Sequence, residues 1–127
     1  MTKPAILIVE DDEDIRTQMK WALGSDFEVA TAGDRPEALE AFASGRPLVT
    51  LLDLGLPPRP NDPVEGLGTL SPLLAIVPLT KVVVVSGQGE KQNALRAVGA
   101  GAYDFLCKPV HMEELKIVLQ RCVYVAE

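Results

Sequence analysis

The segment at residues 48–57 constrains the fold more than any other part of this sequence. Residues 48–52 are apolar except for one threonine, a composition typical of a strand buried on both faces of a parallel sheet. Asp53 ends this run, and Gly55 and Pro57 follow as turn residues. Open parallel sheets bind ligands outside the carboxyl ends of their strands, so a carboxylate here is well placed for chemistry. A lone aspartate after a strand more often only caps the next turn. The residues at the other strand ends therefore decide whether Asp53 is a functional residue or a turn residue.

The rest of the chain repeats one unit, a strand followed by a helix. Apolar runs predict strands at residues 5–9, 27–31, 48–53, 81–86 and 102–107. Apolar residues at helical spacing predict helices at residues 13–23, 35–43, 64–76, 90–98 and 112–125, and Gly66, Gly68 and Pro72 interrupt the third. With right-handed crossovers this alternation gives one α/β domain over residues 1–127: a flavodoxin-like, doubly wound five-stranded parallel sheet, order 2-1-3-4-5, with helices on both faces.

Polar side chains follow four of the predicted strands. Glu10 and Asp11 come after the first strand, Asp53 ends the third, Ser86 ends the fourth and Lys108 follows the fifth. Because the carboxyl ends of parallel strands meet at one edge of the sheet, we expect these side chains on one rim. Three carboxylates at close range raise one another's pKa unless a cation neutralises them, and an oxygen-only ligand set suits Mg²⁺.

A hydroxyl and an ammonium group beside such a cation complete a site for a phosphoryl group. In this hypothesis Asp53 is the nucleophile, and Lys108 and the metal balance the charge of the transferred group. Ser86 then donates a hydrogen bond to a phosphoryl oxygen. No histidine is needed, and His111, which lies past Pro109 at a helix start, is interpreted as a surface residue.

Composition excludes several other classes. A net charge of -6 argues against direct binding of nucleic acid or an anionic membrane, because both require clustered Lys and Arg. We see no leader peptide and no apolar run long enough to cross a bilayer, so we expect a cytoplasmic protein. Cys107 and Cys122 lie in apolar surroundings without metal-ligand spacing, and we expect free thiols in the core.

Three enzyme classes lack a required residue. A hydrolase that forms an aspartyl phosphate, of the haloacid dehalogenase type, needs a second acid two residues after its nucleophile, where this chain has Gly55. The Gly-x-Ser-x-Gly motif of α/β-hydrolases fails at Val84, and a dinucleotide-binding Gly-x-Gly-x-x-Gly motif fails at Gln92. These three enzyme classes are therefore disfavoured, and we do not expect an enzyme.

Four segments, at residues 6–12, 52–57, 85–87 and 105–109, together resemble the receiver domain of bacterial two-component response regulators. The resemblance covers essentially the whole chain and keeps the family's motif order. It implies a CheY-like fold and a sensor histidine kinase that donates a phosphoryl group to Asp53.

The resemblance also implies roles for the surrounding residues. Glu10, Asp11 and Asp53 match the acidic residues that hold Mg²⁺, with Asp11 binding directly and Glu10 through water, and the backbone carbonyl of Gly55 is a further ligand. Lys108 matches the family's lysine. Ser86 matches the switch hydroxyl and Phe105 the switch aromatic, although Tyr103, two residues earlier, leaves open which aromatic ring moves.

The loop between Pro57 and Gly66 is longer than in a typical receiver, and we expect Pro58, Pro60 and Pro63 to remodel it beside the site. Gly55 and Gln88 match positions that flank the site and influence the lifetime of the acyl phosphate.

The last helix resembles the receiver end of NtrC-like regulators, which implies transcription regulation through a downstream domain. Its residues Ile117 and Tyr124 lie apart from the inward stripe, and a second receiver or a linker helix could contact them. The alternative to an active receiver is a degenerate one that binds partners without being phosphorylated.

Overall fold

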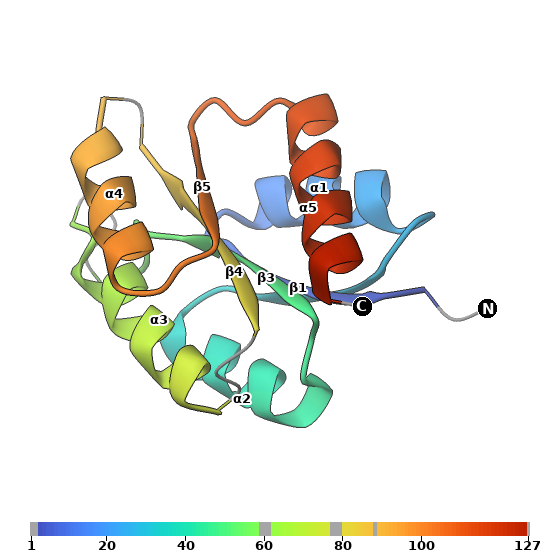
Figure 1. The fold of residues 1–127 in the computed structure, drawn as a ribbon, viewed down its shortest axis with the longest axis horizontal. Helices are drawn as coiled ribbons and strands as arrows, with labels where there is room; N and C mark the ends of the chain where they lie inside the picture. The colour runs from blue at the N-terminus through green and yellow to red at the C-terminus, as the bar shows by residue number, and fades with distance from the viewer. Residues whose placement is uncertain (1–2, 59–61, 77–79, 88, 127) are drawn as a thin grey trace.

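Five parallel strands form the sheet, in the order β2-β1-β3-β4-β5 (Figure 1). The computed structural model describes residues 3–58, 62–76, 80–87 and 89–126. The strands are β1 (Ala5–Val9), β2 (Glu28–Ala32), β3 (Val49–Asp53), β4 (Lys81–Ser86) and β5 (Asp104–Cys107). This strand order confirms the predicted flavodoxin-like, CheY-like topology.

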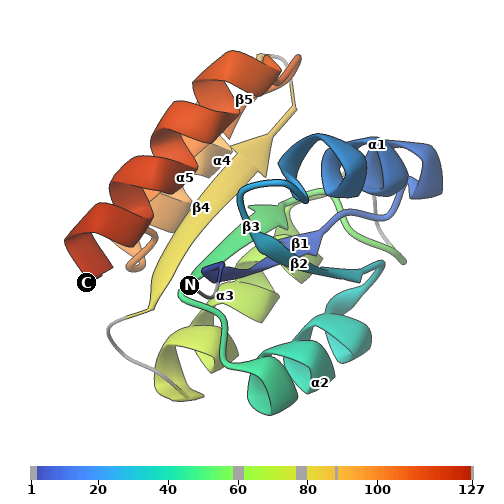
Figure 2. The same ribbon diagram turned by 90° about the vertical axis from the view of Figure 1, so that its right-hand side faces the viewer.

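The helices connect consecutive strands and cover both faces of the sheet, as Figure 2 shows. They are α1 (Glu13–Leu23), α2 (Arg35–Gly45), α3 (Val64–Ile76), α4 (Lys91–Gly99) and α5 (Met112–Ala126). Aspartates begin the first two helices, because the side chain of Asp12 accepts the backbone N–H groups of Asp14 and Ile15, and that of Asp34 accepts the N–H of Glu37.

The core has two layers, one on each side of the sheet. Side chains of α1 and α5 pack on one face, and side chains of α2, α3 and α4 pack on the other. The stripe predicted for the last helix is buried as expected and consists of Leu115, Val118, Leu119 and Cys122. Because both faces are covered, β3 is buried at every residue.

Helix α3 forms despite its two glycines and Pro72. Gly66 explains the first of these interruptions, since a Cβ atom there would lie 2.3 Å from the Cα atom of Leu54. Only a glycine therefore lets α3 pack this closely on the chain that leaves β3.

Several boundaries differ from the prediction. Strand β2 begins one residue later than expected, because the N–H of Phe27 bonds to the carbonyl of Leu23 at the end of α1. Strand β5 begins at Asp104, since the N–H of Ala102 bonds to the carbonyl of Ala97 in α4. Helix α2 continues to Gly45, and α4 begins one residue later than expected.

Part of the predicted proline-rich loop lies outside the described residues. This applies to residues 59–61, Pro60 among them, and separately to Gln88. The expectation of a remodelled loop therefore stays a prediction. None of the helices in the described ranges is long and apolar enough to cross a membrane.

Candidate functional site

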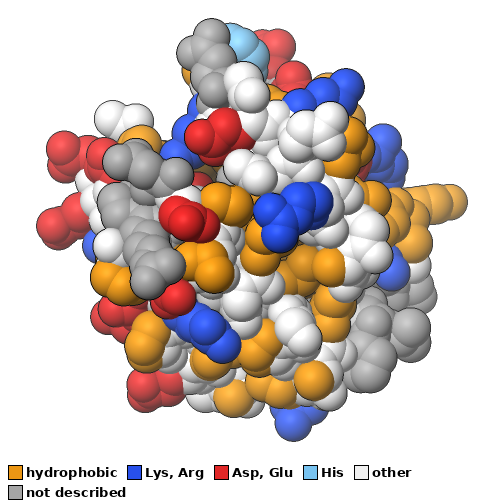
Figure 3. All heavy atoms as spheres, turned by 90° about the vertical axis from the view of Figure 1, so that its left-hand side faces the viewer, with side chains coloured by type: hydrophobic (Ala, Val, Ile, Leu, Met, Phe, Trp, Pro, Cys, Tyr) orange, Lys and Arg blue, Asp and Glu red, His pale blue; other side chains and the backbone are white. Residues whose placement is uncertain are grey.

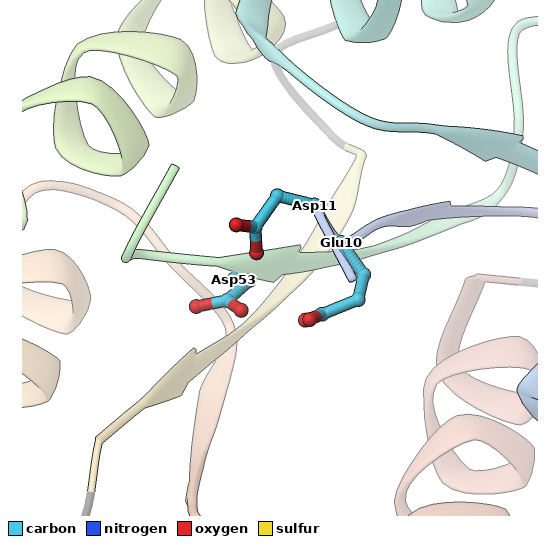
Figure 4. A group of neighbouring side chains, drawn as sticks. All are labelled: Glu10, Asp11 and Asp53. Atoms are coloured by element: carbon cyan, nitrogen blue, oxygen red, sulfur yellow. The ribbon is translucent and has the colours of Figure 1, made fainter. Parts of the chain in front are cut away.

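Three carboxylates converge at the carboxyl edge of the sheet (Figure 4). Asp53 is the last residue of the central strand β3 and is only 2% exposed. Glu10 and Asp11 follow the neighbouring strand β1, where Glu10 is buried and Asp11 is exposed. One carboxylate oxygen from each of the three residues lies within 4.8 Å of the others. The arrangement of the strands thus places the predicted acids together.

Both carboxylate oxygens of Asp53 are held by the chain. The Nζ atom of Lys108 donates to Oδ2 at 2.9 Å, and the backbone N–H of Gly55 donates to Oδ1 at 2.9 Å. The N–H of Lys108 in turn donates to the carbonyl of Ser86, which continues the pairing of β4 and β5 beyond the strand end. Asp53 is therefore fixed in one orientation toward the rim.

The charges at this site are unbalanced. Burial, together with the hydrogen bond to Asp53 and the negative charge of Asp53, raises the pKa of Glu10 to about 8. Burial alone would lower the pKa of Lys108, but its hydrogen bond to Asp53 and the charges of Asp53, Glu10 and Asp11 outweigh this effect and raise it. The ammonium group of Lys108 thus faces three carboxyl groups, and Glu10 keeps its proton in the absence of a further cation.

The donor set fits Mg²⁺. All three side chains offer hard oxygen ligands from two adjacent strand ends, and Asp11 is open to solvent, so water can complete an octahedral shell. A divalent cation would also favour the ionised form of Glu10, which burial and the negative charge of Asp53 now disfavour. Gly55, whose N–H bonds to Asp53, lies directly beside this cluster.

Ser86 lies at the end of β4 and is 1% exposed. Its Oγ atom is 3.6 Å from the Sγ atom of Cys107, at the end of the adjacent strand β5. Cys107 is half-buried at this rim, so the expectation that both cysteines lie in the core is wrong for Cys107. Both thiols are free as predicted, and burial under α5 raises the pKa of Cys122 to about 11.

The two candidate switch aromatics have different surroundings. Phe105 is half-buried and packs against the core layer beneath α2, α3 and α4. Tyr103 precedes β5 and is exposed, and the Nζ atom of Lys81 lies 5.3 Å from the centre of its ring. Phe105 is therefore the one in contact with the core. His111 is exposed, as expected.

Sequence reasoning missed two features of the site. One is Arg16 of α1, whose guanidinium donates to the backbone carbonyls of Glu10 and Asp11. Its only signal in the sequence is a cation on α1, five residues after Asp11. The other is a cavity of about 220 Å³ between α1 and the start of α5. Ile15 of α1 lines this cavity and is 36% exposed.

Figure 3 shows the side of the molecule toward which the strand arrows of Figure 1 point. Acidic side chains gather along one border of this face, whereas basic and hydrophobic side chains are scattered over the rest.

Comparisons with known proteins agree with this geometry. The family model for the response regulator receiver domain matches residues 6–120. An NtrX-like response regulator of Rickettsia bellii is 32% identical over 96% of this chain, and the transcriptional regulatory protein PrrA of Mycobacterium tuberculosis is 34% identical over 91%. The chain spans 25% and 48% of the lengths of these two relatives. The solved receiver domain of NtrX from Brucella abortus is 34% identical, with a TM-score of 0.84 over 94% of this chain and 98% of that one.

Proposed function

The chain belongs to the family of response regulator receiver domains, the phosphoacceptor modules of two-component signalling, and we propose that Asp53 is its phosphoacceptor residue. The observation that carries this proposal is the position of Asp53. Its carboxylate ends the central strand, accepts a hydrogen bond from Lys108 and lies within reach of the oxygens of Glu10 and Asp11. Among the three acids, it is the one that forms an ion pair with Lys108 in the described residues.

The reaction needs little covalent chemistry from the protein. An oxygen of Asp53 forms a bond to phosphorus while the bond between phosphorus and the donor breaks, and the donor leaves with the bonding electrons. Lys108, already 2.9 Å from Asp53, neutralises charge on the transferred group. Glu10, Asp11, Asp53 and the carbonyl of Gly55 would hold Mg²⁺, which would supply further charge stabilisation for the transferred group.

The bound phosphoryl group then acts on the switch residues. Its oxygens are stronger acceptors than the thiol that Ser86 now contacts, so the hydroxyl of Ser86 turns toward the phosphoryl group. Phe105 then fills the space that this movement opens, because it already lies half-buried beside β4. The β4–β5 face thus reports the state of Asp53.

The partners follow from this role. The phosphodonor is a sensor histidine kinase, and the output is transcription regulation through a downstream domain, as the names of the PrrA and NtrX relatives suggest. The phosphoryl group stays on the chain until hydrolysis, so the domain works as a signalling module rather than as an enzyme with turnover on a small substrate.

The test uses acetyl phosphate as a small donor. With Mg²⁺ present, intact-mass measurement of the wild-type chain should show the addition of one phosphoryl group. Asp53→Asn should show none, because an amide is not a nucleophile at neutral pH. Chelation of the metal should also abolish the addition. Unchanged labelling of Asp53→Asn would refute the assignment, and an unlabelled wild type would favour the degenerate receiver instead.

A further inference from the structure

Arg16 contacts the acidic loop from behind the site. Its Nη1 atom donates to the carbonyl of Glu10 at 2.8 Å and to the carbonyl of Asp11 at 3.3 Å. These bonds hold the backbone of the two residues and leave both carboxylates free to point toward Asp53. No other side chain in the described ranges bonds to the backbone of both residues.

The space for the Arg16 guanidinium depends on a glycine. A Cβ atom on Gly33 would lie 2.7 Å from Nη1, a distance at which the guanidinium must move. Gly33 follows Ala32, whose carbonyl accepts the N–H of Glu10 at 2.9 Å. The last residue of β2 and the side chain of Arg16 therefore fix the acidic loop together: Ala32 accepts the N–H of Glu10, and Arg16 donates to the carbonyls of Glu10 and Asp11.

We propose that Arg16, seated against Gly33, is a positioning residue for the divalent cation at the acidic cluster. Two adjacent acids beside a third repel one another, and a loop held only by its backbone would relax away from Asp53. Hydrogen bonds from a cationic donor are stronger than those from a neutral donor, so Arg16 keeps the ligands at binding distance. This inference rests on the proposed function, because it assumes that the cluster binds Mg²⁺.

The sign of the effect separates this role from simple electrostatics. A positive charge near a cation site lowers cation affinity, so loss of Arg16 would tighten Mg²⁺ binding if charge were its main contribution. If Arg16 acts by position, its loss must weaken binding. Residues that orient metal ligands typically change metal affinity by about 10- to 100-fold when they are replaced.

The test is calorimetric titration of the purified chain with Mg²⁺. We expect Arg16→Met to weaken binding by at least about tenfold, and Arg16→Lys, which keeps the charge and part of the donor capacity, to restore part of the loss. Gly33→Ala leaves Arg16 in the sequence but displaces its guanidinium, and should weaken binding by about threefold or more. Gly45→Ala is the matched control, because a Cβ atom there meets nothing within 4 Å.

Thermal unfolding of each metal-free variant shows whether the fold is intact. If Arg16→Met does not fold, Gly33→Ala decides whether the position of the Arg16 guanidinium affects Mg²⁺ binding. Wild-type affinity or tighter binding in Gly33→Ala or in a folded Arg16→Met overturns the inference while leaving phosphorylation of Asp53 in place. A wild-type chain that neither binds Mg²⁺ nor takes a phosphoryl group overturns the proposed function as well.

Discussion

At the scale of single residues, Glu10 links the site to pH. The pKa of Glu10 is about 8 in the folded, metal-free chain and 4.5 without the fold. Between these values the folded chain holds a proton that the unfolded chain has released, so the free energy of unfolding falls as pH rises. We expect a loss of roughly 2–4 kcal/mol over this range, since one pKa unit corresponds to about 1.4 kcal/mol.

Urea unfolding in the presence of a chelator, repeated across this pH range, measures this decrease in the free energy of unfolding. Glu10→Gln should flatten the profile, because the amide does not titrate. Saturating Mg²⁺ should recover most of the stability of the wild type at high pH, since the cation replaces the proton. Profiles of wild type and Glu10→Gln that ran parallel would contradict the assignment.

The second prediction for a single residue concerns the hydroxyl group of Ser86. Ser86→Ala should still accept a phosphoryl group, because Asp53, Lys108 and the acidic pair are unchanged. The response of the switch face should shrink, since the methyl group cannot bond to a phosphoryl oxygen. NMR shifts of Phe105 and of Ala94 in α4, compared before and after phosphorylation, test this. Equal shifts in wild type and Ser86→Ala would disprove the coupling.

Residue types at strand ends were enough to predict that Asp53, Glu10, Asp11 and Lys108 lie together, because parallel strands bring their carboxyl ends to one edge. Arg16 could not be found in this way. Its side chain bonds to backbone carbonyls, and such a contact depends on the direction in which the loop turns after β1, which no periodicity specifies.

At the scale of elements, the packing of α3 on β3 is the most sensitive contact near the site. Gly66→Ala should destabilise the fold by about 2 kcal/mol or more, because the new Cβ atom would meet the backbone of Leu54 at 2.3 Å. Since Leu54 directly follows Asp53, the variant should also be phosphorylated more slowly. Chemical denaturation and the rate of acetyl phosphate labelling measure the two effects.

Gly99→Ala at the end of α4 is the control, because its added Cβ atom meets nothing within 4 Å. A Gly66→Ala variant as stable as this control would show that α3 can shift without loss. The sequence predicted α3 with the correct bounds but treated Gly66 only as an interruption. The need for glycine at this position comes from a contact between segments, so it appears only once α3 and β3 are placed.

At the scale of the whole molecule, α5 presents a second, outward side. Ile117 is 65% exposed and Tyr124 is 82% exposed, as the helical spacing predicted. If this side contacts a second receiver or a linker helix, phosphorylation should increase the sedimentation coefficient of the chain. Beryllofluoride treatment provides the same test without turnover.

Ile117→Lys and Tyr124→Lys should abolish the increase while leaving labelling of Asp53 intact. Lys116→Ala is the control, because Lys116 is the half-buried neighbour of Ile117. This variant removes a charge from α5 but adds no charge to the side that carries Ile117 and Tyr124. A single mass in both states, unaffected by either lysine variant, would rule out assembly through this side.

The Lys108–Asp53 ion pair joins residues that are 55 positions apart, and it connects β5 to β3 across β4. During synthesis the chain therefore exposes Asp53 long before Lys108 leaves the ribosome. A nascent or truncated chain that ends before β5 has the three carboxylates without the ammonium group of Lys108. If Asp53 is the phosphoacceptor as proposed, competence to receive a signal arrives only after the last strand, and labelling by acetyl phosphate then also measures whether synthesis and folding of the domain have been completed.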